Sequence, residues 1–275
     1  MLWIWLGLRV SALTLERVGL RRLGDRQSPW PVMTLAYGGA ALGLWAAALA
    51  GHDLRWRWAA LLPSLTYWAA FTLYTVALVE GPLAVVSPWA NATVPLLFAL
   101  RPSGGVGVVL GLAIFAAGTW MNSAGRRLAR GVWYMLASDA LLAAARLQDA
   151  HQVHAPLSYG ATLYTLVTVW MVTMTQVLRQ PGLGAAWSLL QRRLGWGMLA
   201  LSANAASYLT LLVLLRHLPP GAVEAVSGLA SFFAAWLGVR WLGERQSRRT
   251  LWGALLMALG AGMVLYDHAP GFGVQ

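Results

Sequence analysis

Apolar runs of bilayer length follow one another through almost the whole chain, and the links between them are short. Ten runs come close to the roughly 20 residues that a helix needs to cross a bilayer. They cover residues 2–20, 29–50, 58–79, 82–100, 104–122, 131–150, 156–179, 194–216, 219–242 and 248–267. No soluble domain fits between them, and we expect the longest link, 180–193, to lie along the membrane interface. The sequence therefore predicts an all-α membrane protein with ten transmembrane helices.

The composition supports this class and excludes others. Charged residues make up 11% of the chain, against roughly 25% in a soluble domain. The net charge of +11 does not indicate a nucleic-acid partner, because the arginines cluster in short links, where they set membrane orientation. Most lie on one side, which we count as including Arg17, Arg21 and Arg22 and expect to face the cytosol of a bacterial inner membrane. The absence of cysteine excludes disulfides and thiolate metal sites.

Charges also lie inside two of the runs, in a pattern that repeats. Arg9 lies about halfway along the first run, with Glu16 seven residues later, so both share one helix face. Asp139 and Arg146 repeat this spacing 130 residues further on with the signs reversed. A charge at mid-bilayer costs about 2.5–3.5 kcal/mol, so such residues usually face a partner or a water-filled cavity. We expect the two helices to face each other across a central site.

Other residues recur at similar offsets. Trp58, Ser64, Thr72 and Pro82 return 138 residues later as Trp196, Ser202, Thr210 and Pro220, and Gly111 and Gly118 return 142 residues later as Gly253 and Gly260. We therefore predict two five-helix repeats, residues 1–126 and 127–275, that form one membrane domain. Five is an odd number, so the second repeat enters the membrane from the opposite side. Inverted repeats of this kind place the substrate site near the midplane, in a cavity between the halves.

The charged pairs have two interpretations. If Arg9 and Asp139 form walls of one cavity, Arg9 binds a carboxylate or phosphate and Asp139 binds an amine, which suits an amino acid. Alternatively they form a structural ion pair that ties the halves together. Glu16 and Arg146 are candidates for a gate, or for anchors at helix ends. Glu224 could exchange a proton during transport, or could sit at a helix start near the positive end of the dipole.

Polar and aromatic residues inside the runs suggest further binding positions. Trp89 and Asn91 lie among Pro88 and Pro95, and the matching run carries Ser227, Gly228 and Ser231, so both helices could be broken at a binding site. Kinked packing is the alternative. Trp68, Asn204 and Tyr208 suit an aromatic wall with few polar anchors, although hydrogen bonds between helices explain them equally well.

Signatures of chemistry are missing from the sequence. There is no phosphate-binding Gly-x4-Gly-Lys loop, no His-Glu-x2-His and no nucleophile elbow, so we expect neither an enzyme nor an ATP-driven pump. His151 and His154 lie near Asp149 in what we take as a loop without supporting ligands, and we expect no metal and no cofactor.

The last two runs carry a resemblance to a known family. Leu218–Tyr266 is similar to the closing hairpin of the drug/metabolite transporter superfamily, in its ten-helix EamA-type branch. The likeness lies in Pro220–Ala222, in Leu242–Glu244 and in the glycines 253 and 260, and residues 20–29 resemble the family's first link. The resemblance implies two inverted five-helix bundles that move small metabolites, often outward. The chain departs from the family at 101–104, which replaces a Leu-Gly-Glu link, and at Ala230–Ser231, which replaces a Glu-Pro pair.

These observations together predict a secondary transporter, an exporter of amino acids or similar small metabolites that works by alternating access. Protons are a candidate coupling ion, and both the coupling ion and a homodimer are left open. Two alternatives stand beside it: a structural or lipid-associated membrane protein that transports nothing, and a flippase or uptake permease of the same fold.

Overall fold

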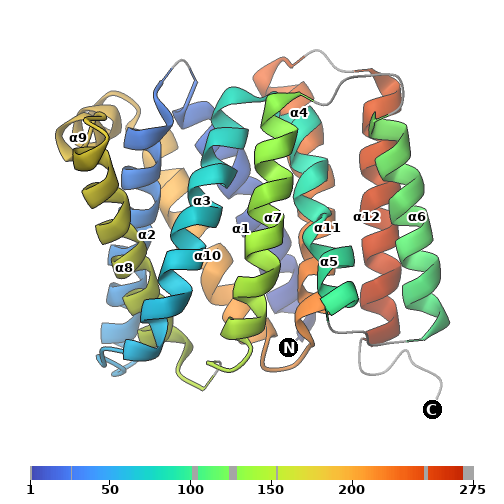
Figure 1. The fold of residues 1–275 in the computed structure, drawn as a ribbon, viewed down its shortest axis with the longest axis horizontal. Helices are drawn as coiled ribbons and strands as arrows, with labels where there is room; N and C mark the ends of the chain where they lie inside the picture. Colours follow the sequence, from blue (N-terminus) through green and yellow to red (C-terminus); the bar gives the residue numbers. More distant parts are fainter. Residues whose placement is uncertain are drawn as a thin grey trace.

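The computed structural model describes residues 2–25, 27–100, 105–123, 129–152, 154–244 and 247–268, and all regular structure within them is helical. The long helices stand side by side, with their ends gathered at two opposite faces (Figure 1). In chain order the helices are α1 (Leu2–Leu23), α2 (Pro29–Ala50), η1 (Trp58–Ala60), α3 (Leu61–Glu80), α4 (Leu83–Val86), η2 (Ser87–Asn91), α5 (Thr93–Leu100), α6 (Val106–Ser123), α7 (Arg130–Asp149), α8 (Pro156–Val177), α9 (Leu183–Arg192), α10 (Leu194–Leu214), α11 (Pro220–Leu242) and α12 (Arg248–His268).

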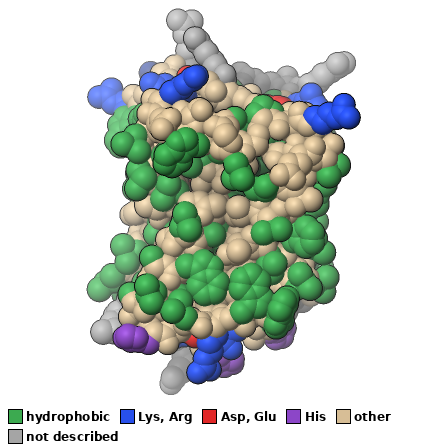
Figure 2. All heavy atoms as spheres, turned by 90° about the vertical axis from the view of Figure 1, so that its left-hand side faces the viewer, with side chains coloured by type: hydrophobic (Ala, Val, Ile, Leu, Met, Phe, Trp, Pro, Cys, Tyr) green, Lys and Arg blue, Asp and Glu red, His purple; other side chains and the backbone are tan. Residues whose placement is uncertain are grey.

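Seven helical segments among the described residues are long and apolar enough to cross a membrane. They are α2, η1 with α3, the segment Leu83–Leu100, α8, α10, α11 and α12. Figure 2 shows apolar side chains over the middle of one face, with arginines and histidines gathered at its two ends. The prediction of an all-α, membrane-spanning chain is confirmed at this level. The runs 2–20, 104–122 and 131–150 form α1, α6 and α7, and their crossing of the membrane stays a prediction.

The fourth apolar run is not one helix. Leu83–Leu100 divides into α4, the 3₁₀ turn η2 and α5. Pro88 lies inside η2 and has no amide hydrogen to continue an α-helical ladder, which explains the interruption. The expected break at this position is confirmed. Its matching run, Pro220–Leu242, is continuous, so the prediction of a second break there was wrong. The serines of α11 instead form hydrogen bonds with residues of other helices, as described below.

Helices from the two halves of the chain pair with one another. The main contacts join α1 to α10 and α11, α3 to α7, α2 to α8, and α6 to α12. The α6–α12 contact depends on glycine: a Cβ atom at Gly111 would lie 2.6 Å from the Gly260 carbonyl oxygen, and one at Gly118 would lie 2.6 Å from that of Gly253. The glycines that recur in the sequence therefore meet each other across antiparallel helices.

Candidate functional site: a charged cavity between the helices

A small cavity of about 40 Å³ lies between the helices. One face of α1 lines it with Arg9, Leu13, Glu16 and Arg17, which recur at helical spacing. The remaining lining residues come from α3, η2, α5, α7, α8, α10 and α11, namely Phe71, Tyr74, Ala90, Thr93, Asp139, Leu142, Arg146, Tyr164, Ser207, Tyr208 and Glu224. A volume of this size holds only one or a few water molecules. The cavity is therefore small, and both charged and apolar side chains line it.

Arg9 is bound from two helices of the second half. Its Nη1 atom donates to the Ser207 hydroxyl at 2.6 Å and to the Ser207 carbonyl at 2.7 Å, and Nη2 donates to the Ser227 hydroxyl at 3.2 Å. Nη2 also lies 3.8 Å from the Glu224 carboxylate. The Arg9 side chain is nearly fully buried, and its Nε has no hydrogen-bond partner among the described residues. The arginine thus ties α1 to α10 and α11.

Glu224 and Arg146 form the shortest ion pair of the cavity. Arg146 Nε donates to Glu224 Oε1 at 2.5 Å, so Glu224 accepts charge-assisted contacts from two arginines, Arg146 and Arg9. The guanidinium of Arg146 also donates to the Tyr67 hydroxyl and lies 3.5 Å from Asp149. Two of the three residues that we expected to act in coupling or gating, Glu224 and Arg146, are therefore in direct contact.

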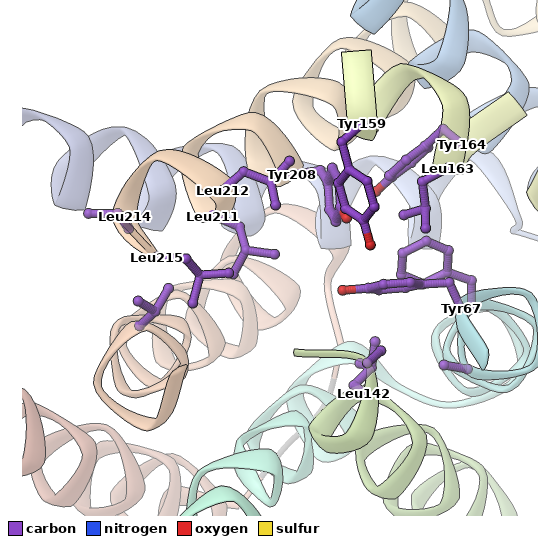
Figure 3. Packing of buried hydrophobic residues seen from close by; sticks show 14 of the residues in the cluster. Tyr67, Leu142, Tyr159, Leu163, Tyr164, Tyr208, Leu211, Leu212, Leu214 and Leu215 are labelled. Atoms are coloured by element: carbon purple, nitrogen blue, oxygen red, sulfur yellow. The ribbon is translucent and has the colours of Figure 1, made fainter. Parts of the chain in front are cut away.

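Asp149 collects hydroxyl groups from three helices. Tyr159 of α8 donates to its Oδ1 at 2.9 Å and Tyr208 of α10 donates at 3.1 Å, while Tyr67 of α3 donates to Oδ2. Figure 3 shows these tyrosine rings grouped beside α7, with the hydroxyls of Tyr67 and Tyr159 pointing into the space between their helices. The carboxylate is fully buried. It closes the end of the bundle at which α7 ends.

A second polar cluster surrounds Arg17 on the other side of the cavity. Its Nε donates to the Tyr74 hydroxyl at 3.1 Å, and its Nη1 donates to the hydroxyls of Ser87, at 3.1 Å, and Ser231. Ser231 in turn donates to Asn91 Oδ1 at 2.5 Å. This cluster joins α1 to α3, to the interrupted segment and to α11. It explains why α11 carries serines without a break in the helix.

The ends of α1 and α11 meet just beyond this second cluster. Glu244 accepts the backbone amides of Leu83 at 2.8 Å and Ala84 at 2.9 Å, and so caps the start of α4. Arg21 donates to the same carboxylate at 3.3 Å and to the Val79 carbonyl at 2.5 Å. One carboxylate therefore links the ends of three helices and the start of α4.

Asp139 differs from every other charge in the cavity. It is fully buried, and neither of its carboxylate oxygens has a hydrogen-bond partner among the described residues. The Thr93 hydroxyl and the Ala92 backbone lie near this carboxyl, and the charged groups around it are Arg17 and Glu224. No ion pair joins it to Arg9 in the described part of the chain. Among the described residues the core buries three arginines and four carboxyls: Arg9, Arg17, Arg146, Glu16, Asp139, Asp149 and Glu224. The buried carboxyls thus outnumber the buried arginines by one.

Glu16 also lines the cavity without an ion pair to any described residue. Its electrostatic neighbours are Ser207 and the three buried arginines. It does not lie near a helix end, because α1 continues to Leu23. Glu16 therefore faces the cavity and not a surface.

The other expected binding residues lie outside the cavity lining. Asn204 accepts the Tyr164 hydroxyl at 2.9 Å, and Asn91 belongs to the Arg17 cluster. Both amide nitrogens are buried without a hydrogen-bond partner in the described residues. Trp89 is buried in one apolar cluster. Trp68 packs against another, and its indole nitrogen has no hydrogen-bond partner among the described residues. Of our seven candidate binding residues, Arg9, Asp139 and Tyr208 line the cavity.

Two site residues were misplaced by the sequence analysis. We counted Arg17 among the surface arginines, but only 2% of it is exposed. Its spacing of eight from Arg9 already puts it on the same helix face. We placed Asp149 in a loop, but it ends α7 as a buried acceptor, three residues after Arg146 and on the same face. Helical spacing from a known buried charge would have identified both.

Comparison with known proteins shows likeness in fold. No protein-family profile and no curated protein sequence matches the chain. Sixteen chains of solved structures match it. One crystal structure aligns with a TM-score of 0.69 at 16% identity, and the alignment covers 94% of this chain and 97% of that chain. At this identity the likeness concerns the fold alone.

Proposed function

We propose that the chain is a ten-helix secondary carrier built from two inverted five-helix repeats, and that it exports amino acids or similar small metabolites across a bacterial inner membrane. The mutual pairing of helices supports the repeat: α1 packs on α10 as α7 packs on α3, while α2 with α8 and α6 with α12 pair equivalent members. The drug/metabolite transporter superfamily remains the family that the sequence motifs favour.

The unbalanced carboxyl of Asp139 is the observation that carries this proposal. An ionised carboxylate buried without an ion-pair partner is destabilising, so an ion pair that ties helices together does not explain Asp139. A cationic group that enters the cavity would relieve this cost. An ammonium group of a substrate and a coupling proton both meet this need, while Glu224 is already held by two arginines. Asp139 is therefore our candidate for the substrate or proton site.

The two polar clusters supply candidates for gates. The Asp149 cluster lies toward the end where α7 finishes, and the Arg17 cluster with Glu244 lies toward the opposite end. In alternating access, one cluster would open while the other stays closed, and the two would then exchange roles. The cavity of about 40 Å³ is too small for an amino acid, so transport of such a substrate requires the helices that line it to move apart.

Transport in reconstituted vesicles tests the proposal. Proteoliposomes are loaded with labelled amino acids, polyamines and small carboxylic acids, and efflux is followed with and without a pH gradient. We expect Asp139→Asn to reduce transport about 10- to 150-fold, because a hydrogen bond to a charged group contributes about 1.5–3 kcal/mol. Glu80→Gln, at the exposed last residue of α3, is the matched control and should transport as the wild type does.

The same variant separates a carrier from a structural protein. Asp139→Asn removes no hydrogen bond made by the described residues, so the thermal stability of the purified protein should be unchanged or higher. Loss of transport with retained stability would support a functional carboxyl. If no solute of the panel moves, or if Asp139→Asn transports at the wild-type rate, the carrier site is refuted. Uptake in place of efflux would instead indicate a permease.

A further inference from the structure

Helix α9 has two different faces. Ala185, Ser188 and Arg192 lie on one of them, while Leu183 and Trp187 lie on the other, with 61% and 62% of their surfaces exposed. Tryptophan and leucine exposed at the end of a transmembrane bundle are typical of the membrane interface. The helix lies across one end of the bundle, beside the top of α8 in Figure 1. Within the link 180–193 the residues Leu183–Arg192 thus form a helix at one end of the bundle, and its place along the membrane interface stays a prediction.

The polar face of α9 forms one wall of a pocket of about 470 Å³. The link between α1 and α2 forms the opposite wall, with Gln27, Ser28 and Pro31. Arg192 and Arg193 both line the pocket, and none of its described lining residues is acidic. Its size falls in the range of pockets that bind small molecules. Serine, glutamine and arginine side chains are all hydrogen-bond donors.

Arg193 is fixed in place by neutral groups. Its Nη1 donates to the Arg22 carbonyl at 2.6 Å and to the Leu23 carbonyl at 3.3 Å, and its Nη2 donates to the Asp25 carbonyl at 3.1 Å. None of the ion pairs found among the described residues includes Arg193 or Arg192. The pocket thus presents two positive charges without a counterion in the described part of the chain, and one of them is held rigid.

We propose that this pocket binds the phosphate of an anionic phospholipid headgroup. Guanidinium groups bind phosphate oxygens through charge-assisted hydrogen bonds, and Ser28, Ser188 and Gln27 add neutral donors. A lipid is favoured over a soluble phosphate because exposed Trp187 and Leu183 suit a helix at the bilayer surface. The acyl chains of the lipid can then pack along the apolar face of α9 that these two residues form. The bound lipid joins α9 to the α1–α2 link and so stabilises this end of the bundle.

Native mass spectrometry of the delipidated full-length protein tests this site. Short-chain phosphatidylglycerol is titrated against phosphatidylcholine of equal chain length, with inorganic phosphate as a competitor. We expect preferential binding of phosphatidylglycerol, and a fall in its affinity of about tenfold in Arg192→Gln. Ser188→Glu, which puts a like charge into the pocket, should weaken binding at least as much. Arg55→Gln changes another exposed arginine, away from the pocket, and should have no effect.

Each outcome decides the proposal. Arg192 and Ser188 are both exposed, so the two variants should fold, which thermal unfolding of each purified protein verifies. Selective loss of phosphatidylglycerol in both variants supports the site. Equal affinity for the two lipids, or an equal loss in Arg55→Gln, would refute it. Displacement of the lipid by an equimolar concentration of inorganic phosphate would refute a lipid site in favour of a free-anion site. Transport activity plays no part in this readout.

Discussion

The close approach of α6 and α12 leads to a sharp prediction at Gly260. A Cβ atom there would lie 2.4 Å from the Gly111 carbonyl oxygen and 2.6 Å from the Phe115 amide nitrogen. Both atoms belong to the backbone of α6, so they cannot move away by a side-chain rotation. Gly260→Ala must therefore push the helices apart, and overpacking of this kind costs about 1–3 kcal/mol.

Gly262 provides a matched control on the same helix. A Cβ atom at this position would meet nothing within 4 Å. Alanine is favoured over glycine inside a helix by about 0.5–1 kcal/mol, and this gain applies equally at positions 260 and 262. The free energies of unfolding of the two alanine variants should therefore differ by the overpacking cost alone, about 1–3 kcal/mol, with Gly262→Ala the more stable.

Thermal and denaturant unfolding of both purified variants in one detergent measures this difference. We expect Gly262→Ala to melt at or above the wild-type temperature and Gly260→Ala to melt several degrees below it. If the two variants unfold at the same temperature, backbone contact between α6 and α12 does not limit stability, and the reasoning fails. Gly111→Ala should repeat the effect from the other helix, because its Cβ would lie 2.6 Å from the Gly260 carbonyl.

Two further predictions concern the ends of the bundle. Glu244→Ala removes both amide acceptors that cap α4, and should lower the free energy of unfolding by about 1–2 kcal/mol, whereas the exposed Glu80→Ala should leave it within about 0.5 kcal/mol in the same unfolding assay. Tyr159→Phe removes one of three hydroxyl donors to Asp149 and should cost about 1–3 kcal/mol, because the carboxylate is buried. A melting temperature equal to that of the wild type would show that water replaces the lost hydroxyl.

Much of the helix layout could be predicted from the sequence. The run 29–50 coincides with α2, and the run 58–79 differs from η1 and α3 by one residue. The first and last residues of these helices could be predicted from the lengths of the apolar runs. Pro29 and Gly51 also mark the start and the end of α2. The recurrence of Gly111 and Gly118 as Gly253 and Gly260 was also visible in the sequence. Which of these glycines touch depends on the relative placement of the two helices.

The site was less predictable, because hydrogen-bond partners come from distant parts of the chain. Arg9 was recognised as a buried charge, yet its partners Ser207 and Ser227 lie about 200 residues away. The local sequence could not show that the ion-pair partner of Arg146 is Glu224 and not Asp139. Arg17 was misassigned because an arginine in the last third of a span has the same composition signal whether it faces lipid headgroups or the interior.

The three tyrosines on Asp149 have a consequence for how the bundle can open. Each hydroxyl comes from a different helix, so α3, α8 and α10 share a single acceptor. If any one of these helices moves away, Asp149 loses a hydrogen bond and its buried carboxylate is less well stabilised. The contacts that hold the other two helices to it then weaken as well. This end is therefore expected to open in one cooperative step and not by gradual fraying, which would restrict the passage of water and ions while it is shut.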